Sequence, residues 1–454
     1  MVNTASNAPL MTEPDAHRLA LQLTQLATQY SIKTWCLAYS GGVDSQVLLH
    51  LLHHTRLDVR AIYIDHQLHS ESSQWARHCA EQCEQMGIPF RVTAVDAQAR
   101  SGESPEAAAR TARYAALAEC IEPGMCLLTA QHQDDQAETV LLQLLRGGGA
   151  AGLSAMPYIS EFSQGWHCRP LLAVAQQSIH AYADQQGLSW VEDPSNQQQH
   201  YDRNYLRHTV IPALQARWPA LNKTLSTFAA QQVEYTELLD QLAASDVLAL
   251  LNSDNGLSIP QLKQLDHARS RNALRYWFKT QQVSMPSRAV LDQLLLQMQG
   301  SDHDTHACVS WGTVEVRRFR DNLFCVQPLA HDPQQNIRWS GAQPLMLHSL
   351  NRVLSLEAYQ TDETTPYVLS DDILNRSLSV RFRQGGERIQ PAGREGHRDL
   401  KSLFQEAAIP AWQRDKIPLI YADEQLVAVT GYWLADEVAK QGKGLLPRLV
   451  SISA

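Results

Sequence analysis

The chain has 454 residues, of which 44% are hydrophobic, and a formal net charge of −9. This composition suits ordinary hydrophobic cores and excludes a disordered protein, and the length predicts two to four domains. There is no apolar run long enough to span a bilayer, and the segment before Pro14 lacks the parts of a secretory signal. We therefore expect a cytoplasmic protein that does not bind membranes.

Strand-like and helix-like segments alternate through the first part of the chain. Apolar runs predict strands at Thr34–Tyr39, Arg60–Asp65, Phe90–Val95 and Met125–Ala130. Helical periodicity predicts helices at Gln46–His54, Ser73–Met86, Pro105–Ile121 and Asp134–Leu145. This alternation predicts an α/β fold, a doubly wound parallel sheet whose ligands bind at the carboxyl ends of the strands.

A glycine-rich turn, Ser40-Gly41-Gly42-Val43-Asp44-Ser45, separates the first strand from the first of these helices. Two glycines allow a tight turn, and free N–H groups at a helix start attract an anion. Asp44 would repel a bare phosphate, so it suggests a magnesium ion between the carboxylate and the phosphate. The turn is not a Walker loop and resembles the pyrophosphatase-type loop of enzymes that split ATP between the α and β phosphates. The alternative is a tight turn with a helix cap.

A second polar group follows the strand Met125–Ala130. It contains His132, Asp134, Asp135 and Glu138, at the first turns of a predicted helix. Asp134 and Glu138 share one helical face. Acidic residues also stabilise a helix N-terminus without any further function. The position at a strand end instead predicts that they face the same crevice as the glycine-rich turn.

The rest of the chain is predicted to form two further domains. Helical periodicity dominates from Ala220 to Met298, a hairpin is expected within Val309–Val326, and short β-like runs follow Gln343. We predict an N-terminal ATP-binding catalytic domain at residues 1–218, a mainly helical middle domain at 219–335 and a small α+β domain at 343–454.

Several motifs in order along the chain are similar to those of the tRNA(Ile)-lysidine synthetase family. Besides the turn and the acidic group, they are Tyr63–Leu68, Glu106–Tyr114, Leu145–Gly149 and Glu192–Arg207. Gln131 departs from the family pattern, in which many members have a second histidine, so we do not expect it to be catalytic. The resemblance covers most of Thr34–Pro212.

The resemblance implies a two-step reaction on the isoleucine tRNA with a CAU anticodon. ATP adenylates the 2-keto oxygen of the wobble cytidine and releases pyrophosphate. The ε-amine of free lysine then displaces AMP, which forms lysidine and switches decoding to AUA.

The resemblance also assigns roles to residues. The ATP-binding residues are expected to be Ser40, Gly41, Gly42, Val43, Asp44, Ser45, His66 and His132, with magnesium at Asp44. The expected catalytic residues are Asp44, Asp135, Glu138 and Arg203, and Asp134, Asp135 and Glu138 are expected to bind lysine. His132 has the alternative role of a helix cap. Gly147–Gly152 is expected to close over the site.

Basic residues in two places are predicted to bind the tRNA. Arg110, Arg113 and Arg207 lie near the site motifs, and Arg110 and Arg113 fit equally well as surface residues of a helix. Residues 376–416 contain nine basic and five acidic residues. The predicted contacts there are Arg381, Arg383, Arg388, Arg394, Arg398 and Lys401. A solvated surface is the alternative for this region.

The sequence leaves two alternative functions. Another AMP-forming ATPase with the same loop, such as a tRNA thiolation enzyme, would need reactive cysteines, and the eight cysteines form no CxxC pair. Cys79 and Cys83 fit better as buried core residues. A non-catalytic RNA-binding protein that kept a nucleotide fold would not need acidic residues at both places. A homodimer is left open.

Overall fold

The computed structural model describes residues 10–67, 72–96, 105–192, 202–252, 255–299, 308–326, 332 and 334–451. The chain divides into two compact units, Met1–Gln241 and Leu242–Ala454. Helix α10 (Leu221–Leu250) runs from the first unit into the second. The three domains predicted above, at 1–218, 219–335 and 343–454, stay a prediction.

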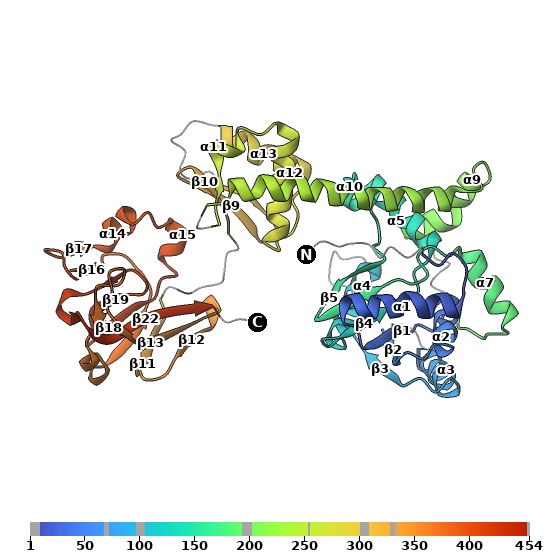
Figure 1. Cartoon of the computed structure of the whole chain (residues 1–454), viewed down its shortest axis with the longest axis horizontal. Helices are drawn as coiled ribbons and strands as arrows, with labels where there is room; N and C mark the ends of the chain where they lie inside the picture. The colour runs from blue at the N-terminus through green and yellow to red at the C-terminus, as the bar shows by residue number, and fades with distance from the viewer. Residues whose placement is uncertain are drawn as a thin grey trace. The chain divides into compact units, whose positions relative to one another are not determined.

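A six-stranded sheet forms the centre of the first unit, in the order β3-β2-β1-β4-β6-β5 (Figure 1). The strands are β1 (Thr34–Ala38), β2 (Val59–Asp65), β3 (Phe90–Ala94), β4 (Met125–Leu128), β5 (Ile159–Phe162) and β6 (Gly165–Cys168). All neighbours are parallel except β5, which pairs antiparallel with β6. The predicted doubly wound α/β fold is confirmed. The chain order reverses beside β1, so the crevice for a ligand is expected between the carboxyl ends of β1 and β4.

Helices cover both faces of this sheet. Alternate residues of β1 point to opposite faces: Trp35 and Leu37 pack in one core with α1, α2 and α7, whereas Cys36 packs in another with α4. The helices are α1 (Ala16–Tyr30), α2 (Val43–His53), α3 (Ser72–Gln85), α4 (Pro105–Glu119), α5 (Gln133–Leu145), α6 (Ala150–Leu153), α7 (Gln176–Gln185), α8 (Asp202–Tyr205), the π-helix η2 (Leu206–Val210) and α9 (Ile211–Gln215).

The four predicted strands and four predicted helices are present within a few residues, but the β5–β6 hairpin and α1 were not predicted. The strands of the hairpin are only four residues long and include Glu161 and His167, so they lack an apolar run. Helix α1 begins at a clear cap, where the Asp15 side chain accepts a hydrogen bond from the backbone N–H of Arg18 at 2.8 Å.

The second unit starts with a small helical part next to a four-stranded sheet. Its elements are β7 (Leu257–Ser258), α11 (Ile259–Leu262), α12 (His267–Thr280), α13 (Arg288–Gln299), β8 (Cys308–Trp311), β9 (Val314–Phe319) and β10 (Asn322–Val326). Trp277 and Phe278 of α12 are fully buried in its core. The predicted hairpin within Val309–Val326 is present as part of this sheet, with Val314 and Val316 buried.

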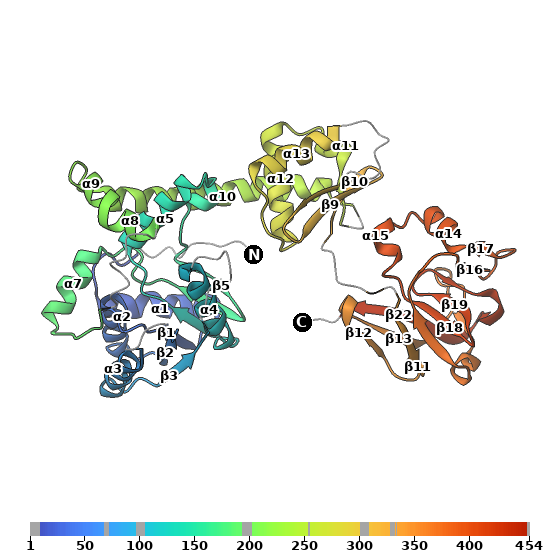
Figure 2. The same cartoon turned by 180° about the vertical axis from the view of Figure 1, so that it is seen from behind.

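The C-terminal part is rich in strands, as predicted (Figure 2). Two five-stranded sheets, β11-β15-β18-β19-β20 and β12-β13-β22-β14-β21, pack with α14 around one core. The strands of the first sheet are β11 (Asn336–Trp339), β15 (Leu378–Arg381), β18 (Leu419–Ala422), β19 (Gln425–Val429) and β20 (Trp433–Leu434). Those of the second are β12 (Leu345–Leu347), β13 (Arg352–Gln360), β14 (Val368–Leu369), β21 (Ala439–Lys440) and β22 (Lys443–Ser451). The remaining elements are β16 (Arg388–Ile389), β17 (Arg398–Asp399), α14 (Leu400–Glu406), α15 (Ala411–Arg414) and the 3₁₀ helices η3 (His348–Leu350), η4 (Asp371–Asn375) and η5 (Asp436–Val438).

The helices of the described residues do not have the properties of membrane spans. In that part of the chain, none combines the length and the apolar character that a membrane crossing would need.

Candidate active site

The glycine-rich turn lies at the carboxyl end of β1, where the strand order predicts a ligand. Gly41 has φ +82°, and a Cβ atom added to it would lie 2.8 Å from Sγ of Cys79. The backbone carbonyl of Gly41 accepts a hydrogen bond from the N–H of Val191 at 2.9 Å. Backbone conformation and close packing therefore both require glycine at this position.

Helix α2 begins at Val43, three residues earlier than predicted, because Gly42 is extended and forms its N-cap. The Ser45 hydroxyl donates to the carbonyl of Gly42 at 2.9 Å, and Oγ of Ser40 lies 3.1 Å from Oγ of Ser45. The predicted loop residues thus form the first turn of a helix whose N–H groups and dipole favour an anion.

His132 connects this turn with the acidic group after β4. It is the N-cap residue of α5, and its backbone N–H donates to Oδ2 of Asp135 at 3.1 Å. Its Nε2 lies 3.7 Å from Oδ2 of Asp44 and 3.5 Å from Oδ2 of Asp135. Burial lowers the pKa of His132, but Asp135, Asp44 and Asp134 outweigh it and raise the pKa to about 9. His132 therefore caps α5, as predicted, and also places a positive charge beside Asp44.

Asp44 has the features of a carboxylate that a cation would complete. Its Oδ1 atom is buried and accepts no hydrogen bond from the described residues. The described residues contain no group of three or more side chains able to hold a metal by themselves. The unpartnered Oδ1 atom of Asp44 fits magnesium, which commonly binds one or two carboxylates together with phosphate oxygens.

Asp135 and Glu138 are held by two arginines from α8 and η2. Arg207 donates through Nε to Glu138 at 2.6 Å and through Nη2 to Asp135 at 2.9 Å. Arg203 donates through Nε to Glu138 at 2.7 Å and lies 3.4 Å from Asp135. Glu138 is 1% exposed, so two guanidinium groups offset the burial of its charge. The structure thus brings together the acidic and basic residues that were predicted as a site.

Asp134 takes a different place from its two acidic neighbours. Its Oδ2 accepts the backbone N–H of Gln176 at the start of α7 at 3.0 Å, and its Oδ1 accepts from Nδ2 of Asn222 at 2.5 Å. These contacts join α5, α7 and α10. The sequence offers no local signal for them, because Asn222 lies 88 residues further along the chain.

A neighbouring polar group at β4 and β6 was missed by the sequence analysis. Nδ1 of His167 lies 3.1 Å from an Arg169 nitrogen and Nε2 lies 2.7 Å from the Thr129 hydroxyl, which contacts Gln131. Burial and the charges of Arg169 and Arg110 lower the pKa of His167 to about 3. His167 is therefore neutral. That Gln131 takes no part in catalysis stays a prediction.

The other predicted residues of the first unit lie in two places, after β2 and on α4. His66 directly follows β2, at the carboxyl edge of the sheet and half-buried. Burial lowers the pKa of Arg113 on α4; Tyr114 opposes this effect, and the charges of Arg110 and Arg203 add to it. Arg110 lies over the ring of Tyr114, with its Cζ 4.9 Å from the centroid.

Five of the six basic residues predicted in the C-terminal part form ion pairs. The pairs are Arg381 with Glu424, Arg383 with Asp415, Arg388 with Asp399, and both Arg394 and Arg398 with Glu406. Lys401 is exposed on α14. Their net attraction for phosphate is therefore smaller than the local sequence charge suggests.

Leu68, Asp193–Asn196 and Tyr201 lie outside the described residues. Gly147–Gly152 is described: Gly147 has φ +72° and α6 begins at Ala150. The role of this segment as a closing element stays a prediction.

Family models match three parts of the chain. They are a PP-loop domain at residues 15–214, a TilS substrate binding domain at 257–324 and a TilS substrate C-terminal domain at 378–448. The tRNA(Ile)-lysidine synthase of Methylococcus capsulatus is 40% identical over 414 residues, which cover 89% of this chain and 93% of the relative. That of Coxiella burnetii is 39% identical and covers 92% of this chain and 93% of the relative.

The chain belongs to the tRNA(Ile)-lysidine synthase family. It is an enzyme with a PP-loop domain, which uses ATP, and a ligase that forms lysidine on an isoleucine tRNA. In this lysidine synthase family member, Asp44 of the glycine-rich turn lies 3.7 Å from His132, which caps the helix of the acidic group.

The thiolation alternative has less support. The U34-tRNA thiolase NcsA from Methanococcus maripaludis matches with 16% identity and a TM-score of 0.39, covering 48% of this chain and 78% of that one, too weak a likeness to support an inference. In this lysidine synthase family member, burial raises the pKa of both Cys79 and Cys83 to about 12. Both thiols are free and fully buried, as the sequence predicted, so they are poor nucleophiles.

Proposed function

We propose that the turn Ser40–Ser45 and the carboxylates Asp135 and Glu138 form two halves of one two-step site. In the first step, the wobble cytidine of the isoleucine tRNA with a CAU anticodon attacks the α phosphate of ATP, and pyrophosphate leaves. In the second step, the ε-amine of lysine bonds to carbon 2, the bond from that carbon to AMP breaks, and the amine loses a proton. The observation that carries this proposal is the 3.7 Å distance between His132 Nε2 and Asp44 Oδ2 across the β1–β4 crevice.

The first step needs mainly positioning and charge stabilisation. The backbone N–H groups at the start of α2, with the Ser40 and Ser45 hydroxyls, would hold the pyrophosphate. Asp44 would hold magnesium through its unpaired buried oxygen. Magnesium bound there would neutralise charge that develops between the α and β phosphates. His132, with its raised pKa, would add positive charge beside them.

The second step uses the acidic group. Asp135 and Glu138 would bind the lysine ammonium, and one of them would accept its proton as the amine becomes a nucleophile. In the structure both carboxylates bind Arg203 and Arg207. Lysine would therefore exchange with one of these guanidinium groups. Arg207 is the better candidate, since its side chain is 30% exposed against 24% for Arg203. A released Arg207 could then bind the carboxylate of lysine or a tRNA phosphate.

The tRNA contacts extend this proposal. Arg110 and Arg113 on α4 would bind phosphates near the target base. The C-terminal arginines and Lys401 would bind a more distant part of the tRNA, and this term should weaken with salt. The predicted middle domain would position the tRNA. The cytoplasm, where tRNA and ATP occur, is the proposed location, and a homodimer stays a prediction that sedimentation would test.

Mass analysis of the isoleucine tRNA after incubation with ATP, lysine and the purified chain tests the function. We expect the wobble cytidine to gain one lysyl residue. Release of pyrophosphate over repeated turnovers should require both tRNA and lysine. The methionine tRNA, which also has a CAU anticodon, is the matched substrate control. Pyrophosphate release without tRNA, or a requirement for a sulfur donor, would contradict the proposal.

A further inference from the structure

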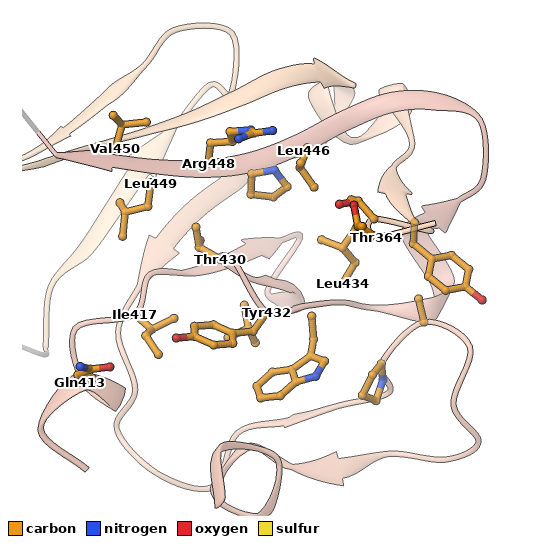
Figure 3. A pocket seen from close by; sticks show the side chains of 18 of the residues that line it. Thr364, Gln413, Ile417, Thr430, Tyr432, Leu434, Leu446, Arg448, Leu449 and Val450 are labelled. Atoms are coloured by element: carbon orange, nitrogen blue, oxygen red, sulfur yellow. The ribbon is translucent and has the colours of Figure 1, made fainter. Parts of the chain in front are cut away.

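A large cavity in the C-terminal part is unexplained by the proposed reaction site. It has a volume of about 1080 Å³. Figure 3 shows Thr430 and Tyr432, from the β19–β20 connection, below strand β22, which carries Leu446 and Arg448. All its walls belong to the second unit, so the cavity does not depend on the placement of the first.

The charged side chains among the described residues that line this cavity are all basic. Among the residues that the structure describes, its lining includes Arg352, Arg394, Lys416 and Arg448 and no aspartate or glutamate. Arg394 and Arg448 bind Glu406 and Glu357, whose carboxylates lie outside the lining. The cavity is thus basic in a chain whose formal net charge is −9. An anionic ligand is favoured, because it would bind without opposing carboxylates on the walls.

Aromatic rings form part of the same wall. Tyr432 is 46% exposed, and its ring centroid lies 5.6 Å from that of Trp433 with 36° between the planes. Trp433 in turn lies 5.6 Å from the buried ring of Phe404. Contact with the core residue Phe404 therefore holds the two rings in place, while the ring of Tyr432 stays accessible. Little side-chain entropy would be lost when a ligand binds to this ring. Such a supported ring can stack with a nucleic-acid base.

A buried polar group adds a third observation. Thr430 lines the cavity and is 4% exposed, and its hydroxyl oxygen has no hydrogen-bond partner among the described residues. A buried hydroxyl without a partner is unfavourable, and a ligand with donors and acceptors would satisfy it. Apolar lining residues such as Leu434 and Leu446 would cover a base edge or a sugar.

We propose that this cavity binds an unpaired nucleotide of the tRNA, with its base on Tyr432 and its phosphate near Arg352 and Lys416. The proposal rests on tRNA being the substrate. Cations and a supported ring together fit nucleic acid better than an acidic peptide, which has no base to stack. The nucleotide has to be unpaired, because bases within a duplex stack on one another and do not present their faces to a side chain.

Binding of a fluorescein-labelled five-nucleotide RNA to the full chain tests the proposal. Loss of one base stack costs about 1–3 kcal/mol, so Tyr432→Ala should weaken binding by about tenfold. Tyr432→Phe keeps the ring and should bind like the wild type. Arg352→Ala should also weaken binding. Arg338→Ala, an exposed arginine that does not line the cavity, is the matched control and should have little effect.

Two results would overturn the proposal. One is equal binding of the single strand by the wild type and Tyr432→Ala. The other is displacement of the RNA by an acidic peptide as readily as by unlabelled RNA. The same RNA in a duplex should bind at least several-fold more weakly.

Turnover separates this proposal from the proposed function. Tyr432→Ala should raise KM for tRNA and leave kcat and KM for ATP unchanged. A wild-type chain that makes no lysidine would refute the proposed function, whereas the RNA-binding comparison would still decide the role of the cavity. An unchanged KM for tRNA in Tyr432→Ala would count against the cavity alone.

Discussion

Arg207 donates through Nε to Oε1 of Glu138 at 2.6 Å and so fastens the π-helix η2 to helix α5. Arg203 binds the other carboxylate oxygen of Glu138 at 2.7 Å. Two guanidinium groups thus offset the burial of this carboxylate, and π-helical turns are frequent at functional sites. The contact between Arg207 and Glu138 therefore holds two elements of the fold together. In the proposed function, it is also the place where lysine binds.

Glu138→Gln should impair both activity and stability. Removing one partner of a buried ion pair lowers the free energy of unfolding by about 3–5 kcal/mol. Because both arginines are partly exposed, we expect a loss of about 3 kcal/mol or less here. Lysidine formation should fall by at least about 100-fold, a loss of about 2.7 kcal/mol in transition-state stabilisation. Tritiated lysine incorporation and urea denaturation measure the two effects.

A double-mutant cycle tests whether Glu138 and Arg207 act together. The free-energy changes of Glu138→Gln and Arg207→Gln should be non-additive by about 1–3 kcal/mol. Glu119→Gln, at the end of α4, is a matched control for the loss of one carboxylate. Additive effects would show that the pair does not act as a unit.

Asp44→Asn should abolish most ATP-dependent chemistry without unfolding the chain. It removes the charge that is proposed to bind magnesium, so adenylation should fall by about 100-fold or more and need more magnesium. Pyrophosphate release over a magnesium titration measures this. Asp58→Asn is the matched control, because Asp58 accepts from Thr34 at the opposite, amino-terminal edge of the sheet. A normal magnesium dependence of Asp44→Asn would disprove the assignment.

Gly41→Ala should destabilise the chain even without ligand. A positive φ costs a side chain about 1–2 kcal/mol, and the new Cβ would approach Sγ of Cys79 to 2.8 Å. Thermal unfolding should show a midpoint lowered by a few degrees. Gly42→Ala is the control, since the nearest atom to its Cβ is Oγ of Ser40 at 3.7 Å. Adding Cys79→Ala should restore only the packing part of the loss, and full recovery would show that φ is not strained.

Asp134→Ala should affect stability more than lysine binding. Its carboxylate holds Gln176 and Asn222, so the free energy of unfolding should fall by about 1–3 kcal/mol. Asn222→Ala should cause a similar but smaller loss, and the two changes should be non-additive. KM for lysine should stay near that of the wild type. A tenfold rise of this KM in Asp134→Ala, without loss of stability, would instead make Asp134 a lysine ligand.

Because its pKa is lowered, the buried His167 side chain should make the folded chain less stable in acid. Its folded-state pKa is lowered by burial to about 3, whereas an unfolded histidine titrates near about 6.5. The unfolded chain therefore binds the extra proton first, and the folded state loses stability as pH falls from about 6.5 towards about 3. Between about pH 7.5 and pH 5 this should amount to about 2 kcal/mol.

His167→Gln should lack this part of the pH dependence, as urea denaturation at the two pH values would measure. His180→Gln, on the exposed side of α7, is the control and should behave like the wild type. Parallel pH profiles for the wild type and His167→Gln would rule out a neutral buried His167.

The sequence by itself determined the local elements and the chemistry of the two strand-end segments. The apolar run before Ser40, the two glycines and the spacing of Asp134 and Glu138 are signals within a few residues, and such signals act through local backbone preferences. They placed both segments at strand ends, although α2 begins three residues earlier than predicted. The β5–β6 hairpin was not predicted because its short strands lack an apolar run, unlike the equally short β4.

Only the tertiary structure decided which side chains meet. Arg203 and Glu138 are 65 residues apart, and Asp134 and Asn222 are 88 apart, so no local preference relates them. Their contacts follow from the strand order β2-β1-β4 and from the packing of α5, η2 and α10. This packing separated Asp134, which joins helices, from Asp135 and Glu138, which bind arginines. The same reason explains the basic cavity of the C-terminal part, whose Arg352, Lys416 and Tyr432 come together only when the two sheets pack around their shared core.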